Sequence, residues 1–163
     1  MPEGTTISYV RSKLRAYQSI FNVDAVIIDE LQMLAATKSR ESERAELNEV
    51  VHSAKQLAID HDGGRGVPIL VPWQMSRAAW EAARNNGGRY TRASLSETAM
   101  AERRADIVIS MYKHPESLHR VSAQILKQRS GPIGDFELHV DYGRCLVRAA
   151  HSEIATDLPQ LEV

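Results

Sequence analysis

The sequence predicts an α/β fold in which a mostly parallel sheet, flanked by helices, is extended by an antiparallel hairpin. Two observations support this prediction. Short β-branched runs alternate with segments of helical periodicity as far as about residue 112, which is typical of parallel strands joined by right-handed crossovers. Two segments of alternating apolar and polar residues then flank a Gly-Pro turn sequence, which is typical of a hairpin.

The helical segments are identified by apolar residues that recur every three or four positions. Residues 7–20 and 40–60 have this spacing, and the second segment is the clearest amphipathic pattern in the chain. The glycine-rich residues 61–66 end it. Shorter helices are predicted over residues 75–84 and 96–104.

The strand segments are short and rich in β-branched residues, and we expect the first to be a buried parallel strand. In chain order, the predicted strands are residues 23–29, 67–71, 107–112, 121–127, 136–140 and 145–147. Together with the helices they predict one domain over residues 1–149. The weakly patterned tail over residues 150–163 need not be ordered.

The composition limits the classes of function. The formal net charge of -1 gives no global attraction to nucleic acid or to anionic membranes, so any DNA contact must be local. The single cysteine, Cys145, excludes an internal disulfide and suits a reducing compartment. No apolar run approaches the ~18 residues of a membrane span, and no signal-peptide pattern is present, so we expect a cytoplasmic protein without membrane contact. The histidines have no metal-ligand spacing, and we expect His114 and His119 to be solvated.

Two polar residues follow predicted parallel strands at their carboxyl ends, where such sheets bind ligands. Asp29 ends the first apolar strand, a position from which an acid can hold a nucleotide-bound magnesium ion, often through water. Gln74 follows the second strand, where a side-chain amide can sense a γ-phosphate or an attacking water. Taken alone, each residue has a simpler explanation: a strand that ends in a solvated acid, and a glutamine that caps the next helix.

Lys127 and Arg129 lie two residues apart near the turn of the predicted hairpin. Residues at this spacing share one face of a strand. Two cations on one face suit a polyphosphate, and a guanidinium can bind it in bidentate fashion. The alternative is a basic edge strand whose charges face solvent and oppose aggregation.

The order and spacing of these segments resemble those of the DnaB-like replicative DNA helicases. The resemblance rests on the acid-ended strand with Leu-Gln at 27–32, the Val-Pro strand with Gln74 and Arg77, the Ser-Glu loop ahead of Ala105, and the Lys-Gln-Arg-Ser-Gly-Pro-Ile-Gly hairpin at 127–134. It covers residues 5–148, and the hairpin is its most specific part. The resemblance implies a RecA-like ATPase domain, of which residues 1–149 would form the second half.

The resemblance also implies ATP and Mg²⁺ as cofactors and a role for each candidate residue. Asp29 looks like the Walker B acid near magnesium, and Gln74 looks like the residue that links nucleotide state to the DNA-facing loops. Lys127 and Arg129 look like finger residues that reach into the ATP site of a neighbouring subunit. The family's ATPase domains form a hexameric ring around single-stranded DNA, so each site is shared between subunits.

The polar loop before Ala105 is the segment that, by resemblance, faces DNA. The family commonly has an arginine where this sequence has Ser96, ahead of Glu97. Arg89 and Arg92 lie just upstream and are candidates to replace that charge, because phosphate affinity rests on such cations. An ordinary solvated connection is the alternative for this loop.

One family motif, the G-x-x-x-x-G-K-[ST] phosphate loop, is not found, since the sequence contains no Gly-Lys dipeptide. Without that backbone cradle we expect the chain alone to bind ATP poorly and to be inactive as an ATPase. We also expect an exposed sheet edge or apolar face, which would favour self-association or a P-loop-bearing partner. Two alternatives to a motor role stay open: a non-catalytic subunit or regulator that completes or blocks a partner's ATP site, and a RecA-like ATPase of the recombinase or circadian-clock type.

Overall fold

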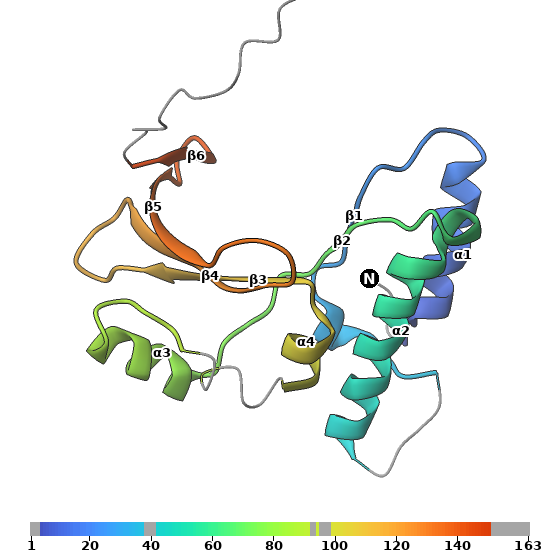
Figure 1. Cartoon of the computed structure of the whole chain (residues 1–163), viewed down its shortest axis with the longest axis horizontal. Helices are drawn as coiled ribbons and strands as arrows, with labels where there is room; N and C mark the ends of the chain where they lie inside the picture. The colour runs from blue at the N-terminus through green and yellow to red at the C-terminus, as the bar shows by residue number, and fades with distance from the viewer. Residues whose placement is uncertain (1–3, 38–41, 92–93, 95–98, 151–163) are drawn as a thin grey trace, which may run out of the picture. The chain divides into compact units, whose positions relative to one another are not determined.

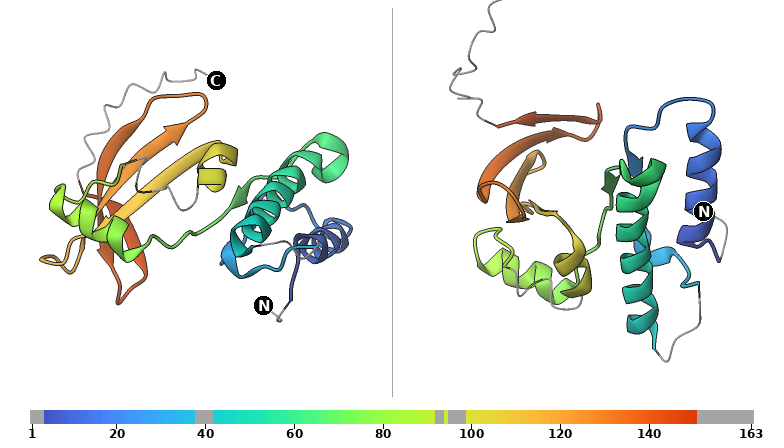
Figure 2. Two further views of the ribbon diagram at one scale, coloured as in Figure 1. Left: turned by 90° about the horizontal axis from the view of Figure 1, so that it is seen from below. Right: turned by 45° about the vertical axis from the view of Figure 1, so that its right-hand side comes forward.

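The chain forms two compact units (Figures 1 and 2). The computed structural model describes residues 4–37, 42–91, 94 and 99–150, so most of the predicted tail lies outside the described residues. Unit 1 is drawn from Met1–Ser76 and Leu95–Asp106, and unit 2 is drawn from Arg77–Ser94 and Ile107–Val163. Unit 1 contains a parallel pair of strands and unit 2 a four-stranded antiparallel sheet, which confirms the α/β class.

The helices and strands lie within a few residues of their predicted bounds. In unit 1 they are α1 (Ile7–Gln18), β1 (Val26–Ile27), the 3₁₀ helix η1 (Leu31–Met33), α2 (Glu43–Gly64), β2 (Ile69–Leu70) and α4 (Ala99–Arg104). In unit 2 they are α3 (Arg77–Asn85), β3 (Ile107–Lys113), β4 (Arg120–Gln128), β5 (Gly134–Asp141) and β6 (Leu146–Ala149). Of the helices in the described ranges, none is long and apolar enough to cross a membrane.

Hydroxyl side chains begin the two long helices of unit 1. Thr6 Oγ1 accepts a hydrogen bond from the backbone amide of Tyr9 at 3.4 Å, and Ser42 Oγ accepts one from Ala45 at 3.3 Å. Each cap satisfies an amide that the first turn leaves without a helical partner. The regular part of α2 ends where residues 61–63 leave helical backbone angles, as the glycine-rich segment predicted.

The core of unit 1 forms around α2, which lies beside α1 (Figure 2). The buried residues of α2 recur at helical spacing, and Leu57 is 0% exposed. They pack against α1 and the segments next to β1 and β2, because these elements present their own apolar side chains to the same interior. The buried cluster consists of Ile7, Leu14, Ile28, Leu31, Leu34, Val50, Val51, Ala54, Leu57 and Val67.

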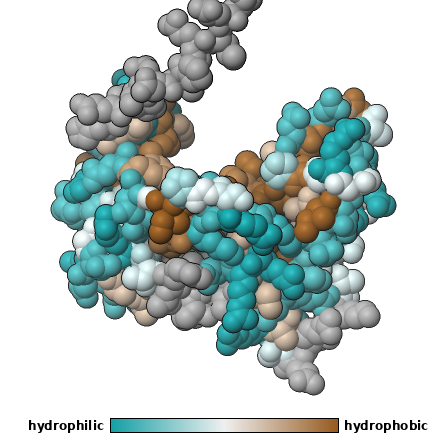
Figure 3. All heavy atoms as spheres, viewed as in Figure 1, coloured by the Kyte–Doolittle hydropathy of each residue, from teal (hydrophilic) through white to brown (hydrophobic). Residues whose placement is uncertain are grey.

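β1 and β2 are parallel, with Val26 opposite Ile69 and Ile27 opposite Leu70. The expectation of a buried first strand is only partly correct. Ile28, directly after β1, is 1% exposed, but Ile27 and Leu70 are 66% and 65% exposed. Successive side chains of a strand point to opposite faces, and the core covers only one face of this pair. Apolar surface therefore remains over β1 and β2, where Figure 3 is brown, and it corresponds to the apolar face expected from the sequence.

The sheet of unit 2 has the strand order β3-β4-β5-β6, and every neighbouring pair is antiparallel. The predicted hairpin is confirmed by β4 and β5, in which Arg120 lies opposite His139 and Ile125 opposite Gly134. It does not extend the parallel pair as expected, because it pairs with β3 and β6 in a sheet of its own. β3 joins the same sheet through residues 114–119. That connection is too short for a parallel crossover, which needs roughly a dozen residues or more, so β3 and β4 must be antiparallel.

Aromatic rings connect α3 and the segment after it to this sheet. Trp80 of α3 stacks on Tyr112 of β3 with ring centroids 6.2 Å apart, and Tyr90 meets Tyr112 edge-on at 6.1 Å. The backbone amide of Tyr90 donates to Gln124 Oε1 of β4 at 2.8 Å. Burial, with a smaller effect of the neighbouring Tyr112, raises the pKa of the Tyr90 hydroxyl. The segment that contains Tyr90 is thus attached to the sheet through Tyr112 and Gln124.

Replacing Leu57 by alanine is expected to lower the free energy of unfolding by about 2–5 kcal/mol, because a fully buried side chain would leave a cavity. Ile59→Ala is the matched control, since Ile59 lies on the same helix and is 48% exposed. Its effect is expected to stay near 0.5 kcal/mol, roughly the size usual for surface sites. Urea unfolding followed by circular dichroism measures both, and equal losses would contradict the core described above.

Candidate functional site

Asp29 and Gln74 follow the two parallel strands of unit 1. Asp29 is exposed and comes directly after Ile28, whose side chain anchors the end of β1 in the core. Gln74 is exposed and comes a few residues after β2. Because the strands are parallel and in register, their carboxyl ends meet at one edge of the pair. The structure therefore brings the two residues to the same edge, as the sequence predicted.

Two further side chains tie Gln74 to the segment after β1. Gln74 Nε2 donates a hydrogen bond to Glu30 Oε1 at 2.5 Å. The backbone amide of Gln74 donates to Gln32 Oε1 at 3.3 Å. Sequence reasoning did not assign a role to Glu30, although an acid next to Asp29 was a visible signal. Both the backbone and the side chain of Gln74 are thus held by residues from across the strand pair.

The chemistry of this edge fits a magnesium ion. Asp29 provides an exposed carboxylate, and oxygen ligands are the ones that Mg²⁺ prefers. No group of three or more His, Cys, Asp or Glu side chains in the described residues could hold a metal ion by itself. An ion near Asp29 would therefore take its other ligands from water and phosphate oxygens, which is usual for Mg²⁺.

Lys127 and Arg129 lie in unit 2, at the turn between β4 and β5. Lys127 is a half-buried residue of β4 opposite Val108, whereas Arg129 is exposed and lies one residue beyond the end of the strand. The Gln128 side chain donates to the carbonyl of Ser130 at 3.2 Å and closes the start of the turn. Gly131 has φ 144°, and a Cβ there would come within 2.4 Å of the Gln128 side chain, so the turn requires glycine.

The residues expected to face DNA are only partly described. Arg89 is exposed, and its guanidinium forms an ion pair with Asp135 at the start of β5. Arg92, Ser96 and Glu97 lie outside the described residues.

The segment after the loop that is predicted to face DNA is held on α2. Lys55 Nζ bonds Asp106 Oδ2 at 2.5 Å, at the carboxyl side of α4. The side chain of Lys55 is 19% exposed and that of Asp106 is 53% exposed, so the bond lies partly out of solvent. This bond attaches the end of α4 to α2.

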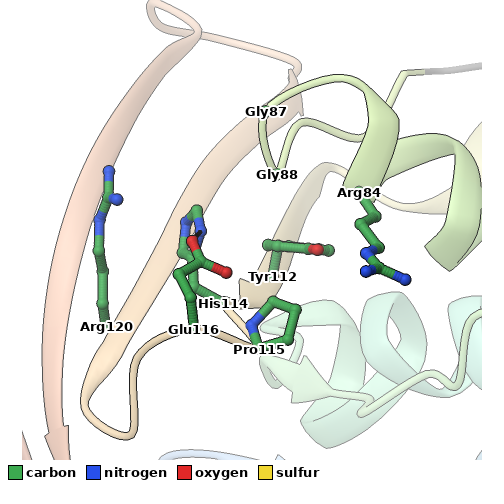
Figure 4. A pocket seen from close by; sticks show the side chains of 8 residues that line it. All are labelled: Arg84, Gly87, Gly88, Tyr112, His114, Pro115, Glu116 and Arg120. Atoms are coloured by element: carbon green, nitrogen blue, oxygen red, sulfur yellow. Dashed lines mark hydrogen bonds and ion pairs between the residues drawn. The ribbon is translucent and has the colours of Figure 1, made fainter.

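A cavity of about 630 Å³ lies in unit 2, with Arg84 and Arg120 on opposite sides and His114 and Glu116 between them (Figure 4). The expectation that His114 is solvated is wrong, because the residue is 6% exposed. Its Nδ1 bonds Glu116 at 2.9 Å and its Nε2 bonds Ser122 at 2.7 Å. A backbone hydrogen bond, helped by His114 and Arg120, lowers the pKa of the Glu116 carboxyl group. These pairings give His114 and Glu116 a structural explanation within unit 2.

Comparison with known proteins identifies a family and several relatives. The model of the DnaB-like helicase C terminal domain matches residues 2–144. The replicative DNA helicase DnaB of Geobacillus stearothermophilus is 28% identical over 139 residues, which cover 81% of this chain and 29% of that protein. The replicative DNA helicase DnaC of Bacillus subtilis is 26% identical over 142 residues, which cover 83% of this chain and 30% of that protein. The chain thus spans less than a third of the length of these curated relatives.

Solved structures share the fold. One solved ATPase domain aligns with a TM-score of 0.71 and 24% identity, over 88% of this chain and 51% of that one. A DnaB-like replicative helicase, solved in a study of its interactions with primase, aligns with a TM-score of 0.68 and 24% identity, over 85% of this chain and 33% of that one.

Gly88→Ala is expected to destabilise the protein more than Gly87→Ala, which is its matched control. Both residues have positive φ, 85° and 63°, so alanine costs about 1–2 kcal/mol at either site. Only at Gly88 would a Cβ also meet the rings of Tyr112 at 2.8 Å and His114 at 3.0 Å, adding about 1–3 kcal/mol. Denaturant unfolding measures the difference, and equal losses would show that the close approach to Tyr112 is absent.

Proposed function

Because the chain belongs to the DnaB-like helicase C-terminal domain family, matched over residues 2–144, we propose that it supplies part of an ATP-dependent DNA helicase motor. In this proposal Asp29 is the acid beside nucleotide-bound magnesium, and Gln74 responds to the nucleotide. Lys127 and Arg129 are finger residues that act on the ATP site of a neighbouring subunit. Unwinding of DNA by the assembled motor is the activity proposed.

The observation that carries the proposal is the edge shared by the carboxyl ends of β1 and β2. Asp29 follows β1 at this edge, and Gln74 follows β2. Sheets of this kind bind ligands outside the carboxyl ends of their strands. The bond between Gln74 and Glu30 supports a common site, because it joins the residue after Asp29 to the residue proposed to sense the nucleotide. A solvated acid and an unrelated helix cap would not require such a contact.

Magnesium-bound ATP fits this edge, and the bound ion would neutralise charge on the phosphates. Asp29 would hold the ion through its carboxylate, directly or through water. Gln74 would orient a water or a phosphate oxygen through its amide. Lys127 and Arg129 would stabilise the charge that develops during phosphoryl transfer, an effect worth roughly 10³–10⁵ in rate in other NTPases.

The 163 residues contain no Gly-Lys dipeptide and hence no phosphate loop of the usual kind. The cradle for the α- and β-phosphates would therefore come from polypeptide outside these residues. We propose that the complete site is shared between subunits of a ring that encloses single-stranded DNA. Arg89, Arg92, Ser96 and Glu97 belong to the segment that would approach the DNA.

A second candidate function is that of a non-catalytic subunit or regulator, which uses the Lys127 and Arg129 hairpin to complete or block the ATP site of a partner. The same lack of a Gly-Lys dipeptide favours it. The two functions differ in the effect of Asp29. In a motor subunit Asp29 is needed for turnover at a site that contains it, whereas a regulator acts through the hairpin alone.

Adding the purified chain to the P-loop-bearing half of a relative, which lacks the segment that this chain matches, is expected to give Mg²⁺-dependent ATP turnover at a site that contains Asp29. Arg129→Ala should lower the restored rate by roughly 10³ or more, and Lys127→Ala should lower it as well, because each removes a charge from the transition state. Arg148→Ala on β6 is the matched control, since Arg148 is also an exposed arginine of unit 2.

Three outcomes of this assay separate the functions. Loss of the added turnover in both Arg129→Ala and Asp29→Ala supports the motor. Loss in Arg129→Ala alone, or inhibition of an intact relative by the wild-type chain, supports the regulator. Turnover that is unaffected by either substitution contradicts both.

A further inference from the structure

We propose that Glu30 is a positioning residue that fixes the orientation of the Gln74 side-chain amide. This inference rests on the proposed function, in which Gln74 acts on the nucleotide. Glu30 is not proposed to touch ATP or the metal ion. Its role is to decide which atom of Gln74 is presented to the ligand.

The geometry gives Gln74 two fixed points. Its side-chain nitrogen bonds the Glu30 carboxylate at 2.5 Å, and its backbone nitrogen bonds the Gln32 side chain at 3.3 Å. Glu30 and Gln32 belong to the segment after β1, and Gln74 belongs to the segment after β2. An exposed glutamine would otherwise sample many rotamers, so two bonds from the neighbouring strand end reduce that freedom.

The polarity of the bond follows from the chemistry of the two groups. An ionised carboxylate only accepts hydrogen bonds, whereas a primary amide has two donors on nitrogen and an acceptor on oxygen. Gln74 must therefore present its NH₂ group to Glu30, and its carbonyl oxygen Oε1 is turned to the opposite side of the amide. The carbonyl oxygen is therefore offered to a ligand as an acceptor, while Glu30 occupies one of the two N–H donors.

An acceptor suits the O–H of an attacking water or the N–H of a cation from a neighbouring subunit. It does not suit a phosphate oxygen, which is itself an acceptor. The second N–H of the amide is a donor, but it lies on the nitrogen that is bonded to Glu30, whose charge repels a phosphate. Of the two roles open to Gln74, sensing a γ-phosphate or orienting water, the charge of Glu30 therefore favours orienting water. A charge-assisted bond is also stronger than a neutral one, so it stabilises this orientation of the Gln74 amide.

Glu30 can be altered without disturbing the core. Its side chain is half-buried, while the apolar anchors on either side of the Asp29-Glu30 pair, Ile28 and Leu31, are 1% and 3% exposed. Glu30→Gln keeps the volume and removes the charge. The amide of Gln74 could then bond the new residue through either its nitrogen or its oxygen, so the fixed orientation would be lost.

The first experiment observes the Gln74 side-chain amide in the 163-residue chain by ¹⁵N-edited NMR, with the resonance assigned by its loss in Gln74→Ala. In the wild type we expect one amide proton shifted downfield and protected from solvent exchange. Glu30→Gln should remove both features, whereas Glu81→Gln, which removes an exposed acid of α3, should retain them. An amide that is unchanged in Glu30→Gln would overturn the inference.

The second experiment measures ATP turnover in the mixture with the P-loop-bearing half of a relative, where the site contains Glu30 and Gln74 of this chain. Glu30→Gln is expected to lower kcat about tenfold with the KM for ATP unchanged, as for a charge-assisted bond that acts on the transition state alone. Gln74→Ala should lower kcat at least as much, and the double variant should lose no more than Gln74→Ala, because both changes act through one amide. Additive losses, or a wild-type kcat in Glu30→Gln, would overturn the inference.

The two experiments separate failure of the inference from failure of the proposed function. If Asp29→Ala and Arg129→Ala abolish turnover while Glu30→Gln has no effect, the motor stands and the role of Glu30 is wrong. If the mixture shows no turnover dependent on Asp29, the proposed function fails. The NMR comparison then still decides whether Glu30 orients Gln74.

Discussion

The candidate site depends on the parallel pairing of β1 with β2. Residues far apart in the sequence, Asp29 and Gln74, meet at one edge because Val26 lies opposite Ile69 and Ile27 opposite Leu70. A shift of register by one residue would turn every side chain of a strand to the other face. The buried Ile28 opposes such a shift, since a move by one residue would turn its side chain out of the core. Packing in the α2 core is therefore what places the polar groups at the edge.

Most of the elements could be predicted from the sequence, because their signals are local. The periodicity of α2, its end at the glycine-rich segment and the hairpin of β4 and β5 each follow from neighbouring residues. An exposed apolar face was expected, but its place at Ile27 and Leu70 could not be predicted, because the cover of a strand's second face depends on residues elsewhere. The position of Asp29 and Gln74 at strand ends was predictable for the same local reason, whereas the roles of both residues stay predictions.

The contacts that sequence reasoning missed are those between side chains of distant segments. The bond from Gln74 to Glu30 joins residues more than forty positions apart, and no spacing rule predicts it. His114 was expected in solvent because it borders a loop, but Tyr112, Glu116 and Ser122 surround it. For the buried His114, the charged and hydroxyl partners offset the cost of its removal from water. Such pairings can be identified only from the three-dimensional structure, which brings the distant segments together.

The ion pair between Arg89 and Asp135 bears on how this surface would meet a polyanion. A cation that neutralises a DNA phosphate displaces a condensed counterion, and the gain in entropy makes binding steeply dependent on salt. Arg89 already has a carboxylate as its counter-charge, so a phosphate approaching it would have to compete with Asp135. The thermodynamic driving force from released salt ions is correspondingly smaller. Contact through this arginine would respond weakly to ionic strength and would be governed by the exchange of one anionic partner for another.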